Sequence, residues 1–185
     1  EEMNGRRANS AADATKLLQY AKSLGCNYVR LAHYPHNEHM IKKADELGLM
    51  VWEEIPVYWT VDFGNAATYK NAENQLLEMI SRDKNRASVI IWSVANETPS
   101  SDARNEFLKN LVLKTRMTDS SRLVSAALLT RSENGISIID DKMEDWLDII
   151  SINQYRGWYG GDLATAPEAK WQTVFNKPLL VSEFG

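Results

Sequence analysis

This chain of 185 residues is 44% hydrophobic and carries 21 basic and 25 acidic residues, which gives a formal net charge of −4 at pH 7. That length supports one well-buried core but is short for a complete eight-stranded barrel. Because the acidic balance offers no basic surface for phosphate groups, nucleic acid is not an expected partner. Cys26 is the only cysteine, which excludes an internal disulfide, and no apolar run approaches the length of a membrane span.

Helical and strand-like patterns alternate along the chain. The first predicted helix begins at Ser10, which fits an N-cap, and stops at Gly25. Apolar residues at helical spacing predict helices over about residues 10–24, 37–47, 71–82, 102–117 and 167–175. Short apolar runs between them predict strands over about residues 26–33, 49–56, 87–94, 122–128, 147–155 and 177–185. The segment from Arg131 to Glu144 is helix-poor and separates the fourth strand from the fifth.

The six predicted strands are rich in Val, Ile and Leu, as are strands buried on both faces of a parallel sheet. Such a series forms either an open doubly wound sheet or a TIM barrel. The chain has neither a GxGxxG nor a P-loop pattern, which an open nucleotide-binding sheet would carry after its first strand. Polar or ionisable residues instead close four strands, which favours a barrel enzyme: His33, Glu53 with Glu54, Asn96 with Glu97, and Glu183.

Two of these residues, Glu97 and Glu183, suggest a specific chemistry. Each follows a buried-looking strand, so both carboxyl groups can reach the same mouth of a barrel. Paired carboxylates of this kind hydrolyse glycosides, one protonating the leaving oxygen and the other attacking or activating water. Either glutamate alone is better read as half of a structural ion pair. The pair together, with Asn96 directly before Glu97, favours the catalytic interpretation.

Five segments resemble the catalytic barrel of glycoside hydrolase family 2, which holds β-galactosidases, β-glucuronidases and β-mannosidases. They are VRLAHYP at 29–35, EEIP at 53–56, RDKNRASVIIWSVANE at 82–97, INQYRGWY at 152–159 and VSEFG at 181–185. The resemblance implies a (β/α)8 TIM barrel of class α/β, incomplete here because the family's first strand would precede Glu1 and its eighth would follow Gly185. Residues 1–185 would then be one partial catalytic barrel domain holding strands two to seven.

The resemblance also implies roles for the site residues. The glutamate of the family's Asn-Glu pair is the general acid/base, which falls on Glu97, and that of the Ser-Glu-(Tyr/Phe)-Gly motif is the nucleophile, which falls on Glu183. An arginine and a tyrosine at strand ends contact the nucleophile in the family, and they correspond to Arg30 and Tyr155. Retention of configuration requires the two carboxyl groups to lie about 5 to 5.5 Å apart.

Further residues are candidates for substrate binding. Asn96 resembles the residue that holds the sugar 2-hydroxyl, with a strand-end cap as the alternative. His33 matches a family histidine that contacts the sugar, although a lone histidine is more often structural. Glu53 and Glu54 alternate faces of one strand, and we expect Glu54 at the pocket floor.

Aromatic residues in the loops after strand ends are suited to stack on sugar faces, and packing against the barrel rim is the alternative. We assign Trp158 to substrate binding and favour rim packing for Tyr58 and Trp59. His36 and His39 lie three residues apart, but no carboxylate completes a ligand set, so we expect no metal and no cofactor.

The sequence therefore predicts a retaining exo-β-glycosidase with a carbohydrate substrate. A β-galactosidase-like enzyme is the first interpretation. The alternatives are a β-glucuronidase, a non-catalytic carbohydrate-binding or structural fragment, and an endo-acting cellulase-like barrel. The family's glucuronate-recognising residues would lie beyond Gly185, and only Glu1 and Glu2 correspond to its first-strand loop. Open strand edges invite self-association unless other domains cover them. We expect the isolated chain to turn over little substrate, because water would enter beside the nucleophile.

Overall fold

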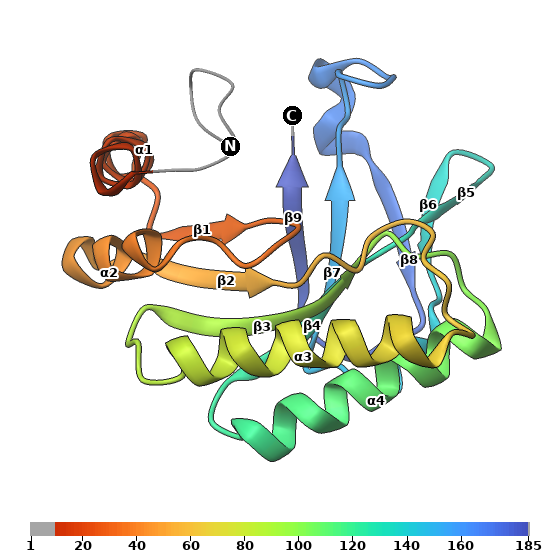
Figure 1. Ribbon diagram of the computed structural model, residues 1–185. Coiled ribbons are helices and arrows are strands. Elements are labelled where there is room, and N and C mark those ends of the chain that lie inside the picture. The colour runs from red at the N-terminus through yellow and green to blue at the C-terminus, as the bar shows by residue number, and fades with distance from the viewer. Residues whose placement is uncertain (1–9, 185) are drawn as a thin grey trace.

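The computed structural model describes residues 10–184, so Glu1, Glu2 and Gly185 lie outside the described residues. The main feature is a sheet of six strands in the order β1-β2-β3-β4-β7-β9, in which every neighbouring pair is parallel (Figure 1). The strands are β1 (Tyr28–Leu31), β2 (Met50–Glu54), β3 (Val89–Asn96), β4 (Leu123–Leu128), β7 (Ile149–Gln154) and β9 (Leu179–Phe184). All six correspond to predicted strands, which confirms the α/β class.

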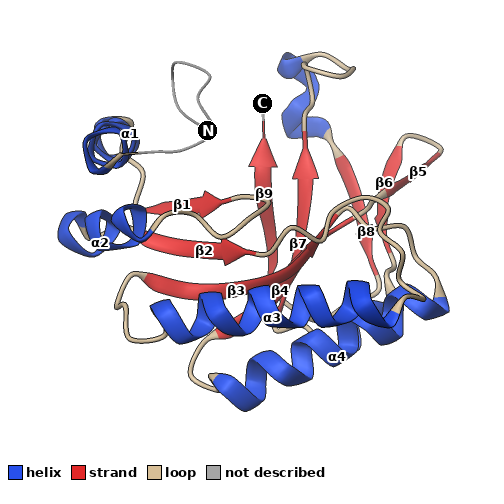
Figure 2. Cartoon of the chain, viewed as in Figure 1, coloured by secondary structure: helices blue, strands red, loops and turns tan. Residues whose placement is uncertain are grey.

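Helices lie on the outside of this sheet (Figure 2). They are α1 (Ala11–Ser23), α2 (Glu38–Leu47), α3 (Ala66–Asp83) and α4 (Asp102–Thr118). Helices α3 and α4 pack on each other and on β3, and α2 packs on β2 and α1. A buried apolar cluster fills the space between the helices and the sheet, with Leu76, Leu108 and Leu111 among its fully buried members. Burial of such side chains is the main force that fixes the helices on the sheet.

Local signals set the ends of the first two helices as the sequence predicts. Ser10 caps α1 by accepting a hydrogen bond from the Asp13 amide, and the Asp13 side chain accepts one in return from the Ser10 amide. Asn37 caps α2, which ends at Gly48 with a φ of 64°, in the left-handed region that glycine adopts without strain. The third helix begins at Ala66, earlier than the predicted position near Asn71, because Asn65 provides a cap that the apolar pattern does not reveal.

The sheet curls, so that its first and last strands approach each other. In Figure 1, β1 to β3 run across the view, whereas β7 and β9 run upward, and the carboxyl ends of the strands meet around one mouth. Side chains of β1 and β9 touch across this mouth, with Arg30 Nη1 2.6 Å from Glu183 Oε1. The fold is therefore an incomplete (β/α)8 TIM barrel that is nearly closed, as the sequence predicts.

A second, smaller sheet flanks the barrel and was not predicted. It pairs β5 (Arg131–Glu133) with β6 (Ile136–Ile139) in antiparallel fashion, and β6 with β8 (Lys170–Thr173) in parallel. The predicted helix over residues 167–175 is therefore wrong. Pro167 lies in a short 3-10 helix, η2 (Leu163–Glu168), and the following residues extend and pair with β6. A second 3-10 helix, η1 (Lys142–Asp145), follows β6.

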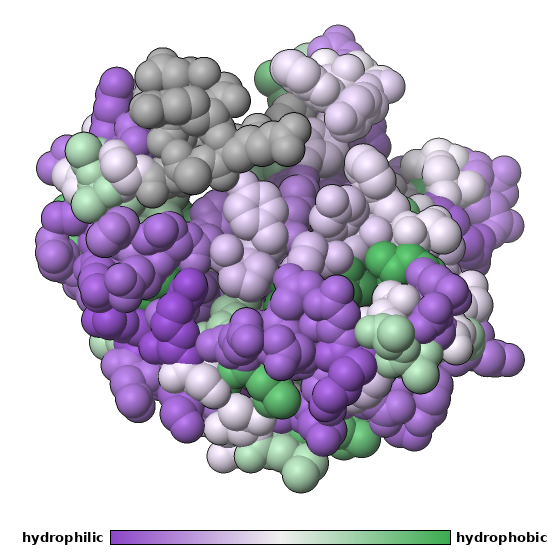
Figure 3. All heavy atoms as spheres, in the orientation of Figure 1, coloured by the Kyte–Doolittle hydropathy of each residue, from purple (hydrophilic) through white to green (hydrophobic). Residues whose placement is uncertain are grey.

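Most of the surface in the orientation of Figure 1 is hydrophilic. Figure 3 shows apolar residues there only as small separate patches. Among residues 10–184, no helix is both long and apolar enough to cross a membrane.

Candidate active site

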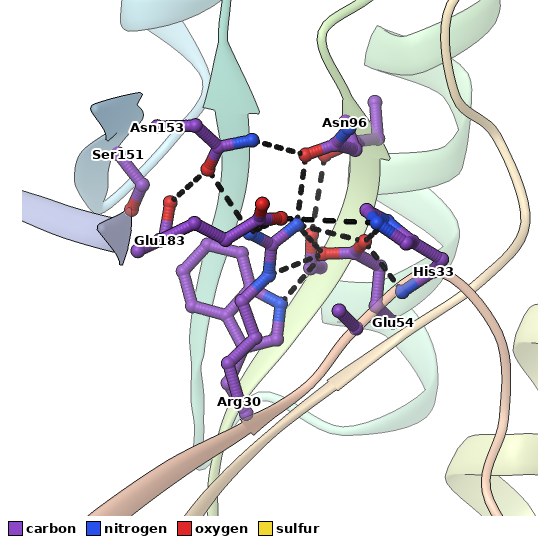
Figure 4. Close-up of polar contacts among 12 residues, drawn as sticks. Arg30, His33, Glu54, Asn96, Ser151, Asn153 and Glu183 are labelled. Atoms are coloured by element: carbon purple, nitrogen blue, oxygen red, sulfur yellow. Dashed lines mark hydrogen bonds and ion pairs between the residues drawn. The ribbon is translucent and has the colours of Figure 1, made fainter. Parts of the chain in front are cut away.

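Arg30, on β1, is the centre of a hydrogen-bond network at the mouth of the barrel (Figure 4). Its side chain is only 4% exposed. The Nη2 group lies 2.8 Å from Glu54 Oε2 and 2.8 Å from Asn96 Oδ1. The Nη1 group lies 2.6 Å from Glu183 Oε1 and 3.1 Å from Asn153 Oδ1. One guanidinium thus links β1 to four other strands, which its planar set of five donors allows.

Glu54, at the end of β2, is the buried counter-charge of Arg30. Its side chain is 0% exposed, and it also accepts hydrogen bonds from the Trp52 indole at 2.8 Å and from the His33 backbone amide at 2.9 Å. Burial by itself would raise the pKa of Glu54, but the interactions with the His33 side chain and the Arg30 charge hold it below its ordinary value. Glu54 is therefore an ionised floor of the site, and alternation places Glu53 on the opposite face, toward Arg82.

Glu183, on β9, is held by two donors from different strands. Arg30 contacts Oε1, and the Tyr155 hydroxyl donates a hydrogen bond to Oε2. His33 Nε2 lies 3.8 Å from Glu183 Oε1. A carboxylate fixed by a cation and a phenol has the surroundings that a carboxylate nucleophile requires.

Glu97, which directly follows β3, lies on the other side of the network. Its Oε1 accepts a hydrogen bond from Asn153 Nδ2 at 3.1 Å, and its Oε2 accepts one from the Trp59 indole at 3.3 Å. Glu97 has a φ of 49° and Trp59 a φ of 54°, both in the left-handed region that costs free energy for residues other than glycine. The neighbouring Asn96 is buried, and its Oδ1 accepts hydrogen bonds from both Arg30 and Asn153.

His33 lies between Glu54 and Glu183. Its Nδ1 is 3.4 Å from Glu54 Oε1, and its backbone has a φ of 73°, a third left-handed residue at this mouth. The interaction with Glu54 raises the pKa of His33 above its ordinary value, against the opposing effect of burial. The imidazole is 42% exposed, so it can meet a ligand in the mouth.

The structure brings together seven of the eight residues that the sequence assigned to this site: Arg30, His33, Glu54, Asn96, Glu97, Tyr155 and Glu183. The eighth, Trp158, lies in the loop after β7 and is 73% exposed. Within the described residues, the contacts of the network do not reach its indole. In the same part of the chain, no group of three or more His, Cys, Asp or Glu side chains is arranged to hold a metal ion.

Two residues of the network were missed from the sequence. Trp59 was interpreted as rim packing, yet its indole donates to Glu97. Asn153 was not singled out, although Ser151 and Asn153 alternate along β7 and Tyr155, two positions further on, directly follows the strand. A run of polar side chains at every second position, near the end of a strand expected in a barrel, is the signal that identifies this inward face.

Comparison with known proteins shows the family to which this chain belongs. The family described as "Glycosyl hydrolases family 2, TIM barrel domain" matches residues 2–185. A β-glucuronidase from Streptococcus agalactiae is 31% identical over 99% of this chain, and one from Rattus norvegicus is 32% identical over 88%. The chain spans only 34% of the first relative and 26% of the second.

Solved structures agree with this result. A β-glucuronidase from an uncultured Clostridium species superimposes with a TM-score of 0.77 at 28% identity, covering 96% of this chain and 33% of that chain. β-Glucuronidase 3 of Bacteroides uniformis, in its apo structure, gives a TM-score of 0.72 at 28% identity, covering 86% of this chain and 20% of that chain.

Proposed function

Because this chain belongs to family 2 of the glycosyl hydrolases, we propose that the full-length protein is a retaining exo-β-glycosidase of the β-glucuronidase type. The sequence alone put β-galactosidase first and β-glucuronidase second. The relatives favour the second interpretation, since the four described above are all β-glucuronidases. On this proposal, residues 1–185 are a catalytic barrel domain.

One observation carries the mechanism. Glu183 and Glu97 lie at the same mouth and are linked by a chain of hydrogen bonds through Arg30 and Asn153. Hydrolysis in two displacements requires two carboxyl groups about 5 to 5.5 Å apart at one site, and their shared mouth supports this role.

In the first displacement, a Glu183 oxygen attacks the anomeric carbon of the terminal sugar, and the bond from that carbon to the glycosidic oxygen breaks. Glu97 gives its proton to the departing oxygen, so the aglycone leaves as a neutral alcohol or phenol. The sugar is then an ester of Glu183. Arg30 and Tyr155 position the attacking carboxylate.

In the second displacement, Glu97 acts as a base. It takes a proton from a water molecule, whose oxygen attacks the anomeric carbon and releases Glu183. Two inversions at the same carbon give net retention. The Asn96 Oδ1 is engaged by Arg30 and Asn153, so its amide nitrogen is the group that it offers to the sugar 2-hydroxyl. His33 is placed to contact a sugar hydroxyl, and Glu54 holds Arg30 from below.

Trp158 enters this proposal only as an exposed ring on the loop after β7. An exposed indole beside a sugar site is suited to stack on an aglycone or on a further sugar unit.

The experiment is steady-state hydrolysis of an aryl β-glucuronide and an aryl β-galactoside by the full-length protein. We expect kcat/KM to favour the glucuronide by at least about 100-fold, since a site built for a charged group rejects the analogue that lacks it. Glu183→Gln should abolish the turnover, and Glu168→Gln, a change at an exposed residue of η2 that is outside the network, should leave it intact. A preference for the galactoside would favour a β-galactosidase instead. If neither substrate were hydrolysed, the proposal of an exo-β-glycosidase would be wrong.

A further inference from the structure

Asn153 contacts Glu97 directly and also contacts Arg30, the residue that holds Glu183. It lies near the end of β7, two residues before Tyr155, and its amide makes four hydrogen bonds (Figure 4). Its Oδ1 accepts from Arg30 Nη1 at 3.1 Å and from Ser182 Oγ at 3.0 Å. Its Nδ2 donates to Asn96 Oδ1 at 2.9 Å and to Glu97 Oε1 at 3.1 Å.

These four partners fix which way the amide points. Arg30 is a donor only, and a carboxylate accepts, so a flipped amide would set its NH2 group against the guanidinium and its oxygen against Glu97. The observed orientation satisfies both donor hydrogens and both acceptor sites. Asn153 is therefore locked, and it presents an N–H group to Glu97 in a constant direction.

The second donor to Glu97 is less constrained. Trp59 belongs to the loop after β2 and is 63% exposed, and its indole lies 3.3 Å from Glu97 Oε2. Asn153 is part-buried and is braced by the Arg30 guanidinium, which also holds Glu183. The position of Glu97 relative to Glu183 thus depends on a chain of two side chains, Asn153 and Arg30.

We propose that Asn153 is a positioning residue that sets the direction of the Glu97 carboxyl group relative to Glu183, an inference that rests on the proposed function of this same site. We expect Asn153 to affect the step in which Glu97 transfers a proton to the leaving group. Proton transfer to a poor leaving group requires the acid to be aligned with the departing oxygen, and a displacement of about 1 Å costs on the order of 100-fold in rate. An activated leaving group departs with little protonation and is insensitive to that alignment.

The test compares Asn153→Asp, Asn153→Ala and Gln154→Ala in the full-length protein. Asn153→Asp keeps the shape and the acceptor for Arg30 and Ser182, and it replaces the NH2 group that faces Asn96 and Glu97 with an oxygen. Gln154→Ala changes the next residue of β7, which strand alternation places on the opposite face from Asn153 and which makes no contact in the network described above, and it serves as the matched control. Thermal unfolding of each variant reports whether it folds.

The measurement is kcat/KM on a series of aryl β-glucuronides whose phenols differ in acidity, together with its pH dependence. We expect Asn153→Asp to lose about 10- to 100-fold on the least activated substrate and less than about threefold on a dinitrophenyl substrate. A second carboxylate beside Glu97 makes loss of the catalytic proton less favourable, so the alkaline limb of the profile should move to higher pH. Gln154→Ala should change neither quantity. Asn153→Ala should show the same dependence on the leaving group with a smaller upward movement of the limb, because it removes the donor to Glu97 without adding a charge.

Equal losses across the leaving-group series, or an unmoved alkaline limb in Asn153→Asp, would assign Asn153 a merely structural role and overturn this inference alone. A wild-type protein that hydrolyses none of the aryl glycosides overturns the proposed function, and this inference with it.

Discussion

Arg30 Nη1 lies 2.6 Å from Glu183 Oε1, although the two residues are 153 positions apart and belong to the first and last strands of the sheet. The same guanidinium makes an ion pair with the fully buried Glu54. Arg30 therefore joins the closure of the barrel to the position of the candidate nucleophile, and a change at this residue is expected to affect stability and catalysis together.

The first prediction concerns the buried pair of Arg30 and Glu54. Arg30→Met removes the cation and leaves the Glu54 carboxylate buried without its partner, so the free energy of unfolding should fall by about 3–5 kcal/mol. Adding Glu54→Gln removes the stranded charge and should restore part of the loss. Denaturant unfolding of the two single variants and the double variant measures the coupling.

The matched control is Arg131→Met, which breaks an exposed ion pair on β5 and should cost at most about 1 kcal/mol. If the double variant loses the sum of the two single losses, Arg30 and Glu54 are not coupled, and the role of Arg30 as a buried counter-charge is wrong.

The second prediction concerns pH and the outer face of β2. Burial, reinforced by the nearby Asp83 carboxylate and opposed by the Arg82 charge, raises the pKa of Glu53 to about 9 from the ordinary value of 4.5. The folded protein then holds a proton that the unfolded chain releases, so this group's contribution to the free energy of unfolding is complete below about pH 4.5 and is lost as pH rises toward 9.

Glu53→Gln should flatten that decline, because a neutral amide binds no proton in either state. Chemical unfolding of the wild type and the variant at a series of pH values measures how the free energy of unfolding depends on pH. Glu168→Gln, at an exposed residue, is the control. Parallel pH curves for wild type and Glu53→Gln would show that Glu53 is ionised in the folded protein.

The third prediction separates the two candidate catalytic glutamates. Glu183→Gln should abolish turnover of every substrate, because among residues 10–184 no other carboxylate is held by both Arg30 and Tyr155. Glu97→Gln should reduce kcat/KM mainly for substrates with poor leaving groups, since an activated phenol departs with little protonation. Steady-state kinetics on a strongly and a weakly activated aryl β-glucuronide give the comparison. Losses of equal size on both substrates for both variants would contradict the division of roles.

The sequence predicted the barrel strands and most of the mouth because both depend on local patterns. Buried parallel strands read as apolar runs, and polar residues at their ends, such as Glu54, Asn96 and Glu183, stand out against them. The helix predicted over residues 167–175 failed because its segment pairs with β6, more than thirty residues away, and no local signal encodes that pairing.

The site residues that escaped prediction are those whose role depends on long-range geometry. Trp59 reaches Glu97 through a left-handed backbone after β2, and Asn153 acquires its four partners only when the sheet curls. A list of strand-end residues identifies which side chains can meet. Such a list does not identify which side chain, here Asn153, connects the others.

The most direct test of the central claim is to trap the sugar on Glu183. A 2-fluoro β-glucuronide with a good leaving group should form the ester quickly and release it slowly, because the fluorine disfavours the oxocarbenium-like transition states. Incubation with the full-length protein, followed by digestion and mass spectrometry of the peptides, locates the modified residue. The account predicts one added sugar on Glu183 and none in Glu183→Gln. A label on another residue, or turnover that proceeds without a label and inverts the anomeric configuration, would contradict it.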